Sequence, residues 1–198
     1  GHVVYVASEG GEGIKKRLAA WARAHKLLPH NIRNIQWVLD SIDLTDTATV
    51  VELVESLKVI YPPKTVCDGE GGVLDVDKLD LRLIVIDTLA QNFGGDENNF
   101  QDMQPFLKAM QQFHADTGAT VLLVHHTNAL GTRERGHSSL RGAINASYEV
   151  TAQRDDDNTI TDIFVKNDKQ KDDARHKMMV FAANVVQLPD LGRDEQGK

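Results

Sequence analysis

Three apolar segments of this 198-residue chain are each followed by polar side chains that suit metal and proton chemistry. Glu9 follows the first segment, Asp87 and Thr88 follow the second, and His125 and His126 follow the third. Mg²⁺ prefers oxygen ligands and keeps several waters, so one carboxylate such as Asp87 can hold it through water. A second carboxylate such as Glu9 can orient an attacking water, and His125 can contact a γ-phosphate. These residue types therefore predict metal-assisted phosphoryl transfer.

Each of these residues also has an ordinary structural explanation when it is taken alone. An Asp after a strand is commonly a cap or turn residue, a Glu there commonly faces water, and a His pair is commonly structural. Open α/β sheets bind ligands at the carboxyl ends of their strands, so three such ends together predict one site. A metal-dependent hydrolase with Asp87, His125 and His126 as ligands is an alternative. It is disfavoured because adjacent His side chains on a strand point to opposite faces.

The hydrophobic pattern predicts strands that alternate with helices in the first two thirds of the chain. The expected strands are 3–7, 35–39, 81–86 and 120–124, and the expected helices are 13–26, 47–59 and 98–117. Asp96 is a candidate cap for the last of these helices, and Gly118 fits its end. Segment 61–80 contains two Pro and several Gly, and we expect it to be a long loop.

The last third of the chain has a different pattern. Segments 147–153 and 159–166 alternate around a polar turn and predict a β-hairpin, and 178–188 predicts a closing strand. Segment 131–142 is polar and is expected to be a flexible loop. The pattern as a whole predicts an α/β fold, with a mainly parallel central sheet flanked by helices and a C-terminal antiparallel hairpin. We expect one domain over residues 1–188 and a flexible tail over 189–198.

Composition limits the classes of protein that fit. Apolar residues make up 41% and charged residues 26% of the chain, as in soluble globular proteins. The apolar runs are too short to span a bilayer, the opening residues do not have the pattern expected of a secretory signal, and there is a single cysteine, Cys67. These features predict a cytoplasmic protein. The net charge of -7 argues against a basic surface that grips duplex DNA everywhere, but it allows a narrow basic stripe.

Five segments together resemble the RepA-like hexameric helicases of the RecA superfamily. They are VVYVASEG at 3–10, LIVIDTL at 83–89, GGDEN at 94–98, VLLVHHT at 121–127 and RGHSSLRGA at 135–143. They follow the order of the family and extend the resemblance from residue 3 to about residue 186. The resemblance implies a RecA-like P-loop NTPase core. It also implies a hexameric ring that binds ATP and Mg²⁺ between its subunits and couples ATP hydrolysis to movement along single-stranded DNA.

The resemblance also implies roles for the residues at the strand ends. Glu9 takes the place of the catalytic glutamate that polarises water. Asp87, with Thr88 beside it, takes the place of the Walker B aspartate that positions Mg²⁺ through water. His125 takes the sensor position, and His126 is the alternative because the two side chains point to opposite faces.

Basic residues near the C-terminal end match two further segments of such ring helicases. Lys169 and Lys171 lie in a stretch that resembles the finger that reaches the nucleotide of a neighbouring subunit, and Arg141 is a second candidate. Lysine in this role would lose the bidentate pairing of arginine. The loop over 131–142 resembles the loop that contacts DNA, and its candidates are Arg133, Arg135 and His137. Both segments also fit ordinary solvated surface.

One family feature is missing from the sequence. The phosphate-binding pattern G-x-x-x-x-G-K-[ST] does not occur, and the Gly-rich run 10–16 has the wrong spacing and carries Glu12. In the family, the phosphate loop precedes the strand that matches 3–7. The chain is therefore expected to be either a truncated ATPase core or a non-catalytic DNA- or partner-binding module that lost the loop. In both cases we expect the chain alone to hydrolyse ATP poorly or not at all.

Overall fold

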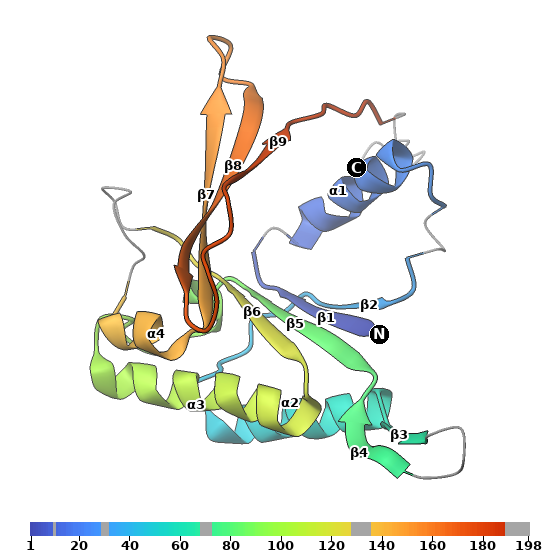
Figure 1. Cartoon of the computed structure of the whole chain (residues 1–198), viewed down its shortest axis with the longest axis vertical. Helices are drawn as coiled ribbons and strands as arrows, with labels where there is room; N and C mark the ends of the chain where they lie inside the picture. Colours follow the sequence, from blue (N-terminus) through green and yellow to red (C-terminus); the bar gives the residue numbers. More distant parts are fainter. Residues whose placement is uncertain (10, 29–31, 68–72, 128–135, 189–198) are drawn as a thin grey trace, which may run out of the picture. The chain divides into compact units, whose positions relative to one another are not determined.

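The computed structural model describes residues 1–9, 11–28, 32–67, 73–127 and 136–188, and their elements are labelled in Figure 1. The chain divides into two compact units. The first comprises Gly1–Lys16 and Leu28–Leu140, and the second comprises Arg17–Leu27 and Arg141–Lys198. Two helices, α1 (Gly11–Ala24) and α4 (Ser138–Ala143), contribute residues to both units.

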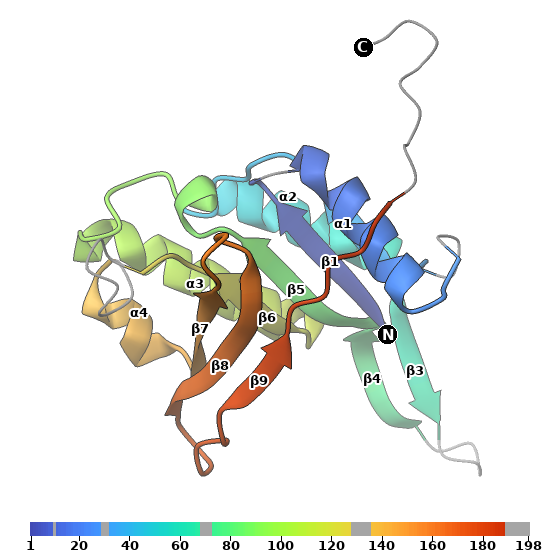
Figure 2. The same ribbon diagram turned by 90° about the horizontal axis from the view of Figure 1, so that it is seen from above.

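The first unit is built around a four-stranded parallel sheet in the order β2-β1-β5-β6. Its strands are β1 (His2–Ala7), β2 (Ile35–Val38), β5 (Leu81–Asp87) and β6 (Thr120–Val124). Val6 is level with Ile86, and Ile86 is level with Leu123. Figure 2 shows β1 and β5 running in the same direction. The predicted parallel sheet is confirmed, and its register brings the carboxyl ends of β1, β5 and β6 to one edge.

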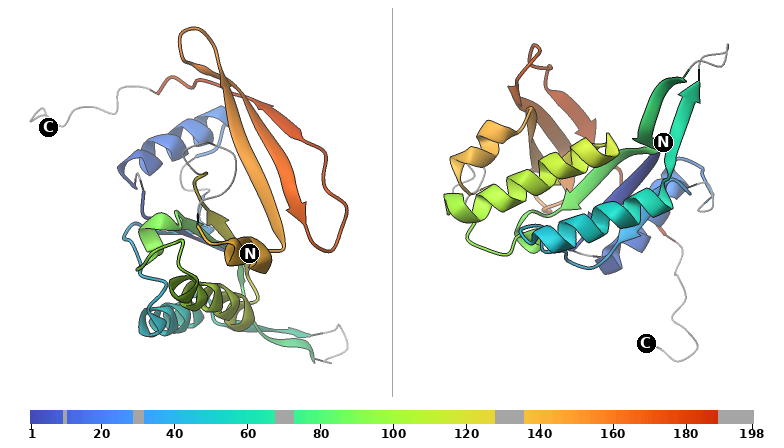
Figure 3. Two further views of the ribbon diagram at one scale, coloured as in Figure 1. Left: turned by 90° about the vertical axis from the view of Figure 1, so that its left-hand side faces the viewer. Right: turned by 90° about the horizontal axis from the view of Figure 1, so that it is seen from below.

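Two helices lie side by side on one face of this sheet, as Figures 1 and 3 show. They are α2 (Thr47–Ile60) and α3 (Phe100–Thr117). Each has one buried apolar stripe, and a fully buried large apolar side chain contributes about 1.5–3 kcal/mol to stability. Val51 lies on α2 outside that stripe and is exposed. The buried side chains of strands and helices that form the core include Val4, Val6, Ile84, Ile86, Val54, Leu57, Met103, Phe106 and Phe113.

The start of α3 differs from the prediction. Asn99, not Asp96, caps the helix, because its side chain accepts a hydrogen bond from the Gln101 N–H at 2.8 Å. Asp96 accepts from the Asn98 N–H at 2.9 Å and shapes the turn before the helix. The predicted end is confirmed, since Gly118 is left-handed with a φ of 69°.

The prediction of a long loop over 61–80 is wrong. β3 (Pro63–Cys67) and β4 (Val73–Leu79) pair as an antiparallel ribbon, and 68–72 lie outside the described residues. Proline is tolerated at the first position of a strand, so Pro63 does not interrupt the ladder. Pro62 and Pro63 lie at the beginning of this ribbon, whereas the Gly residues of the segment lie outside the described residues.

The second unit contains an antiparallel sheet in the order β7-β8-β9. Its strands are β7 (Ala146–Arg154), β8 (Ile160–Gln170) and β9 (Met179–Ala182). The predicted hairpin is confirmed, and its turn contains Asn158 with a φ of 62°, a conformation that Asn tolerates better than most residues. The closing strand β9 is shorter than predicted.

The polar segment 131–142 is not a flexible loop throughout, because its described end forms helix α4. Residues 128–135 and the predicted tail 189–198 lie outside the described residues. Among the described helices, none has the length and apolar character that crossing a membrane requires.

Candidate active site at the ends of the parallel strands

Glu9 and Thr88 meet at the edge where β1 and β5 end. The Thr88 hydroxyl donates a hydrogen bond to Oε1 of Glu9 at 3.0 Å. Thr88 is buried, whereas the Glu9 side chain is 39% exposed. One oxygen of the Glu9 carboxylate is thus held by the protein while the group remains open to solvent. This arrangement suits a carboxylate that orients a water molecule.

Asp87 is held by a residue that the sequence analysis missed. The Tyr5 hydroxyl donates a hydrogen bond to Oδ2 of Asp87 at 2.7 Å. The Tyr5 ring in turn packs against Trp37 on β2, with 5.0 Å between the ring centres. Ala7 is level with Asp87, so Tyr5 lies two residues earlier on the same face of the sheet. The alternation along the strand could have indicated this pair, because Tyr5 carries the only side-chain oxygen within β1.

The two histidines after β6 face different acidic residues. His126 Nε2 lies 3.6 Å from Oε2 of Glu9, and both side chains are exposed to solvent. His125 Nε2 lies 3.9 Å from Oε2 of Glu97, where the two side chains are 9% and 12% exposed. Glu97 lies in the segment 94–98 that carried the family resemblance, but the sequence pattern assigned it no role. The two histidine side chains therefore point in different directions, as expected for adjacent residues. His126 forms a solvent-exposed pair with Glu9, and His125 forms a nearly buried pair with Glu97.

The oxygen atoms at this edge fit the requirements of Mg²⁺. Asp87 and Glu9 are carboxylates on neighbouring strands, and Thr88 adds a hydroxyl. Within the described part of the chain, no three His, Cys, Asp or Glu side chains form a group that could enclose a metal. Mg²⁺ commonly relies on one or two carboxylates together with waters and substrate phosphates, so a closed protein cage is not required. Asp87 is the residue that would hold the ion, which would neutralise charge on the phosphates.

The side chains of two of the three predicted finger residues make contacts inside the second unit. Lys169 Nζ donates to the carbonyl oxygens of Arg141 at 2.5 Å and Ile144 at 2.8 Å, so it caps the C-terminal end of α4. The Arg141 guanidinium lies 2.7 Å from Oδ2 of Asp168. Its hydrogen bond holds the pKa of the Asp168 carboxyl below its usual value. Lys171 is bound through its backbone N–H to the Asn145 carbonyl at 2.9 Å, and its side chain is exposed.

Only one of the three predicted DNA-contacting residues is described. Arg133 and Arg135 lie outside the described residues. The His137 N–H donates to the Glu97 carbonyl at 2.7 Å, and its ring packs 5.3 Å from that of Phe100. His137 Nδ1 also accepts from the Ser139 N–H at 3.1 Å. His137 is therefore anchored at the start of α4 and hydrogen-bonded to Glu97, the residue whose carboxylate faces His125.

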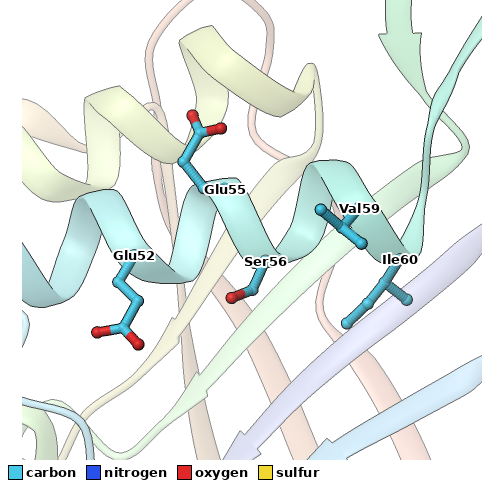
Figure 4. Close-up of a pocket in the computed structure, with 5 residues that line it drawn as sticks. All are labelled: Glu52, Glu55, Ser56, Val59 and Ile60. Atoms are coloured by element: carbon cyan, nitrogen blue, oxygen red, sulfur yellow. The ribbon is translucent and has the colours of Figure 1, made fainter.

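A surface pocket occurs elsewhere, along the exposed side of α2 (Figure 4). It contains none of the residues at the strand ends. The Lys58 ammonium lies 2.8 Å from Glu55, so part of the acidic charge of this helix is already paired. The residues that line the pocket are Glu52, Glu55, Ser56, Val59 and Ile60.

A parallel sheet with carboxylates and histidines gathered at the ends of neighbouring strands has the general form of an α/β ligand-binding site. The family model described as an AAA domain matches residues 1–131, and the chain belongs to this family. The crystal structure of the RadB recombinase is similar, with a TM-score of 0.53 and 12% sequence identity. The alignment covers 91% of this chain and 74% of that chain, and at this identity it shows the fold alone. No curated protein sequence matches.

These comparisons confirm the predicted RecA-like fold. ATPases of this class generally bind ATP together with Mg²⁺.

Proposed function

We propose that this chain is the ATPase core of a RepA-like replicative DNA helicase that works in the cytoplasm as a hexameric ring. The ring would couple ATP hydrolysis to translocation along single-stranded DNA. The observation that carries the proposal is the connected cluster at the strand ends, in which Thr88 and His126 both contact Glu9 and Asp87 lies on the adjacent strand.

In this proposal the groups at the sheet edge divide the work of phosphoryl transfer. Glu9 orients the attacking water and accepts hydrogen bonds from it, because its carboxylate is held by Thr88 yet open to solvent. Asp87 holds Mg²⁺ through water, and Tyr5 keeps the carboxylate in one orientation. His125 and His126 are the candidate sensors of the γ-phosphate, and the exposed one, His126, lies against Glu9.

The remaining proposed contacts lie outside the strand-end cluster. The proposed contacts to single-stranded DNA are made by Arg133, Arg135 and His137. These residue types can bind the phosphates of the DNA backbone, and they lie on one segment of the chain. The proposed finger residues are Lys169, Lys171 and Arg141. A finger residue needs an exposed side chain to reach a neighbouring subunit, and Lys171 has one. Lys169 could take that role only by releasing the α4 carbonyls.

A non-catalytic module with a RecA-like fold is the second candidate function. The contacts of Lys169 and Arg141 favour it, because two of the three candidate finger side chains are engaged within the second unit. Such a module would bind DNA or a partner helicase. Nucleotide binding distinguishes the two candidates, as does a phosphate-binding loop encoded upstream of Gly1 in the native gene.

The test compares ATP turnover by the 198-residue chain with turnover by the longest natural polypeptide that contains it. We expect little or no turnover by the former, and Mg²⁺-dependent turnover stimulated by single-stranded DNA in the latter. In the active polypeptide, Glu9→Gln should lower kcat by about 10²–10⁴-fold, because the amide keeps an oxygen for Thr88 but is a poor base.

The matched control is Glu52→Gln on α2, which changes the same functional group away from the strand ends and should leave kcat unchanged. Absence of DNA-stimulated turnover in the longer polypeptide would contradict the helicase proposal. DNA or partner binding without nucleotide binding would favour the second candidate.

A further inference from the structure

Asn92 has a fully buried side-chain amide, with 0% of its surface exposed, and it lies five residues after the end of β5. It closes the short 3-10 helix η2 (Ala90–Asn92), which follows β5. Its Oδ1 accepts hydrogen bonds from the Ser8 hydroxyl at 3.0 Å and from the Ile42 N–H at 2.9 Å. Its Nδ2 donates to the Thr88 carbonyl at 2.7 Å. One side chain thereby bonds three separate segments of the chain.

These three segments are the ones that carry or flank the candidate active site. Ser8 immediately precedes Glu9, and Thr88 immediately follows Asp87. Ile42 lies between β2 and α2, and this connection is joined to η2 a second time, because the Leu44 N–H donates to the Asn92 carbonyl at 3.0 Å. Asn92 therefore bonds to Ser8 and Thr88, the residues that directly follow β1 and β5 and that neighbour the two carboxylates in sequence.

The buried position makes these bonds costly to lose. Without the Asn92 amide, the Thr88 carbonyl would lose its partner in a bond that is buried from water, and the part-buried Ile42 N–H would lose its partner as well. The chain would satisfy them only by moving the turns that follow β1 and β5. Such movement would separate the Thr88 hydroxyl from Glu9, since their contact is a single hydrogen bond between these two turns.

We propose that Asn92 is a positioning residue of the candidate active site. It fixes Ser8 and Thr88 and thereby holds the Glu9 carboxylate against Thr88 and beside Asp87. It acts through these residues and does not itself touch the reacting groups. The geometric part of the proposal stands on the hydrogen bonds alone, whereas its effect on hydrolysis rests on the proposed function.

The first experiment measures geometry in the 198-residue chain by NMR spectroscopy. Three-bond couplings report the χ1 rotamer of Thr88, and nuclear Overhauser contacts report its distance from Glu9. We expect one Thr88 rotamer in the wild type. In Asn92→Ala we expect averaged couplings, weaker contacts to Glu9, and amide shifts at residues 8 and 9.

Two further variants keep this experiment decisive. Leu57→Ala also removes buried atoms, but Leu57 lies on α2 one turn before Tyr61, which packs against His2 at the opposite end of β1. It should lower stability without changing the Thr88 couplings. If Asn92→Ala does not fold, the same couplings and contacts are measured in Asn92→Asp, and the same changes are expected. The carboxylate keeps the acceptor for Ser8 and Ile42 but loses the donor to Thr88.

The second experiment uses the longest natural polypeptide that hydrolyses ATP. Because small misplacements of reacting groups are costly, Asn92→Ala should lower kcat by about 10–100-fold with the KM for ATP changed by less than about twofold. Leu57→Ala should retain the wild-type kcat at a temperature where both variants are folded. A purely structural role for Asn92 predicts equal kcat for the two variants.

The outcomes separate this inference from the proposed function. Unchanged Thr88 couplings and Glu9 contacts in the Asn92 variants would overturn the inference, and so would a wild-type kcat in a polypeptide that is active. If no natural polypeptide turns over ATP, the proposed function fails, and the NMR comparison still decides whether Asn92 positions Glu9.

Discussion

At the scale of single residues, burial separates groups that look equivalent in the sequence. His125 and His126 are adjacent, yet one faces Glu97 in a nearly buried pair and the other faces Glu9 in solvent. Polar contacts contribute little to stability where water competes for the groups, and more where water is excluded. The two histidines should therefore contribute differently to stability.

A double-mutant cycle on each pair measures this difference. We expect His125 and Glu97 to show a coupling free energy of about 1 kcal/mol, because both side chains are nearly buried. His126 and Glu9 should show about 0.3 kcal/mol, because both are exposed. The measurement is urea unfolding of the 198-residue chain and its Gln variants. A larger coupling for the exposed pair would show that the assignment of partners is incorrect.

At the scale of elements, helix ends depend on individual side chains. The N–H groups of the first turn of a helix have no partners within the helix, so a side chain just before the helix supplies them. In α3 that side chain is Asn99, whereas Asp96 bonds to the Asn98 N–H in the preceding turn. The last carbonyl groups of a helix likewise lack partners within the helix. At the C-terminal end of α4, Lys169 donates hydrogen bonds to such carbonyls.

Asn99→Ala should lower the free energy of unfolding by about 1 kcal/mol, as expected for loss of an N-cap. Asp96→Ala should have a smaller effect, because its partner lies outside the helix. Chemical unfolding of the two variants checks this. If Asp96→Ala were the more destabilising change, the helix would begin earlier than at Phe100.

At the scale of the whole molecule, the parallel sheet ends in two edge strands, β2 and β6, and β6 carries an exposed leucine. Among the described strands, β6 pairs only with β5, and Leu122 on β6 is 48% exposed. Apolar edge strands with unpaired backbone groups readily associate with other chains. A strand supplied by another copy, or by a longer natural polypeptide, would cover this edge.

We therefore expect the 198-residue chain to associate reversibly as its concentration rises, and Leu122→Lys to reduce the association. Charged lysine on an edge strand disfavours pairing. Val59→Lys is the matched control, since Val59 is also exposed but lies on helix α2. Sedimentation velocity over a range of concentrations makes the comparison. Equal association of all three proteins would exclude β6 as the contact.

The local pattern of the sequence is sufficient for much of the fold. The four parallel strands and the β7–β8 hairpin are predicted because apolar runs and alternation depend only on nearby residues. The strand-end positions of Glu9, Asp87 and the two histidines follow from the same pattern, since each comes directly after an apolar run. The β3–β4 ribbon and helix α4 are missed, because a sequence segment rich in Pro and Gly, and a short polar helix, resemble loops in sequence.

Only the tertiary structure decides which partner each of these side chains meets. Tyr5 and Asp87 are 82 residues apart in the chain, and Ser8 and Asn92 are 84 apart. Glu97 and His125 likewise meet although they are distant in the sequence. Such contacts depend on the register of paired strands and on where the turns close, and no local periodicity encodes either. The sequence therefore indicates that a site lies at this edge, and the packed sheet determines how its residues are held.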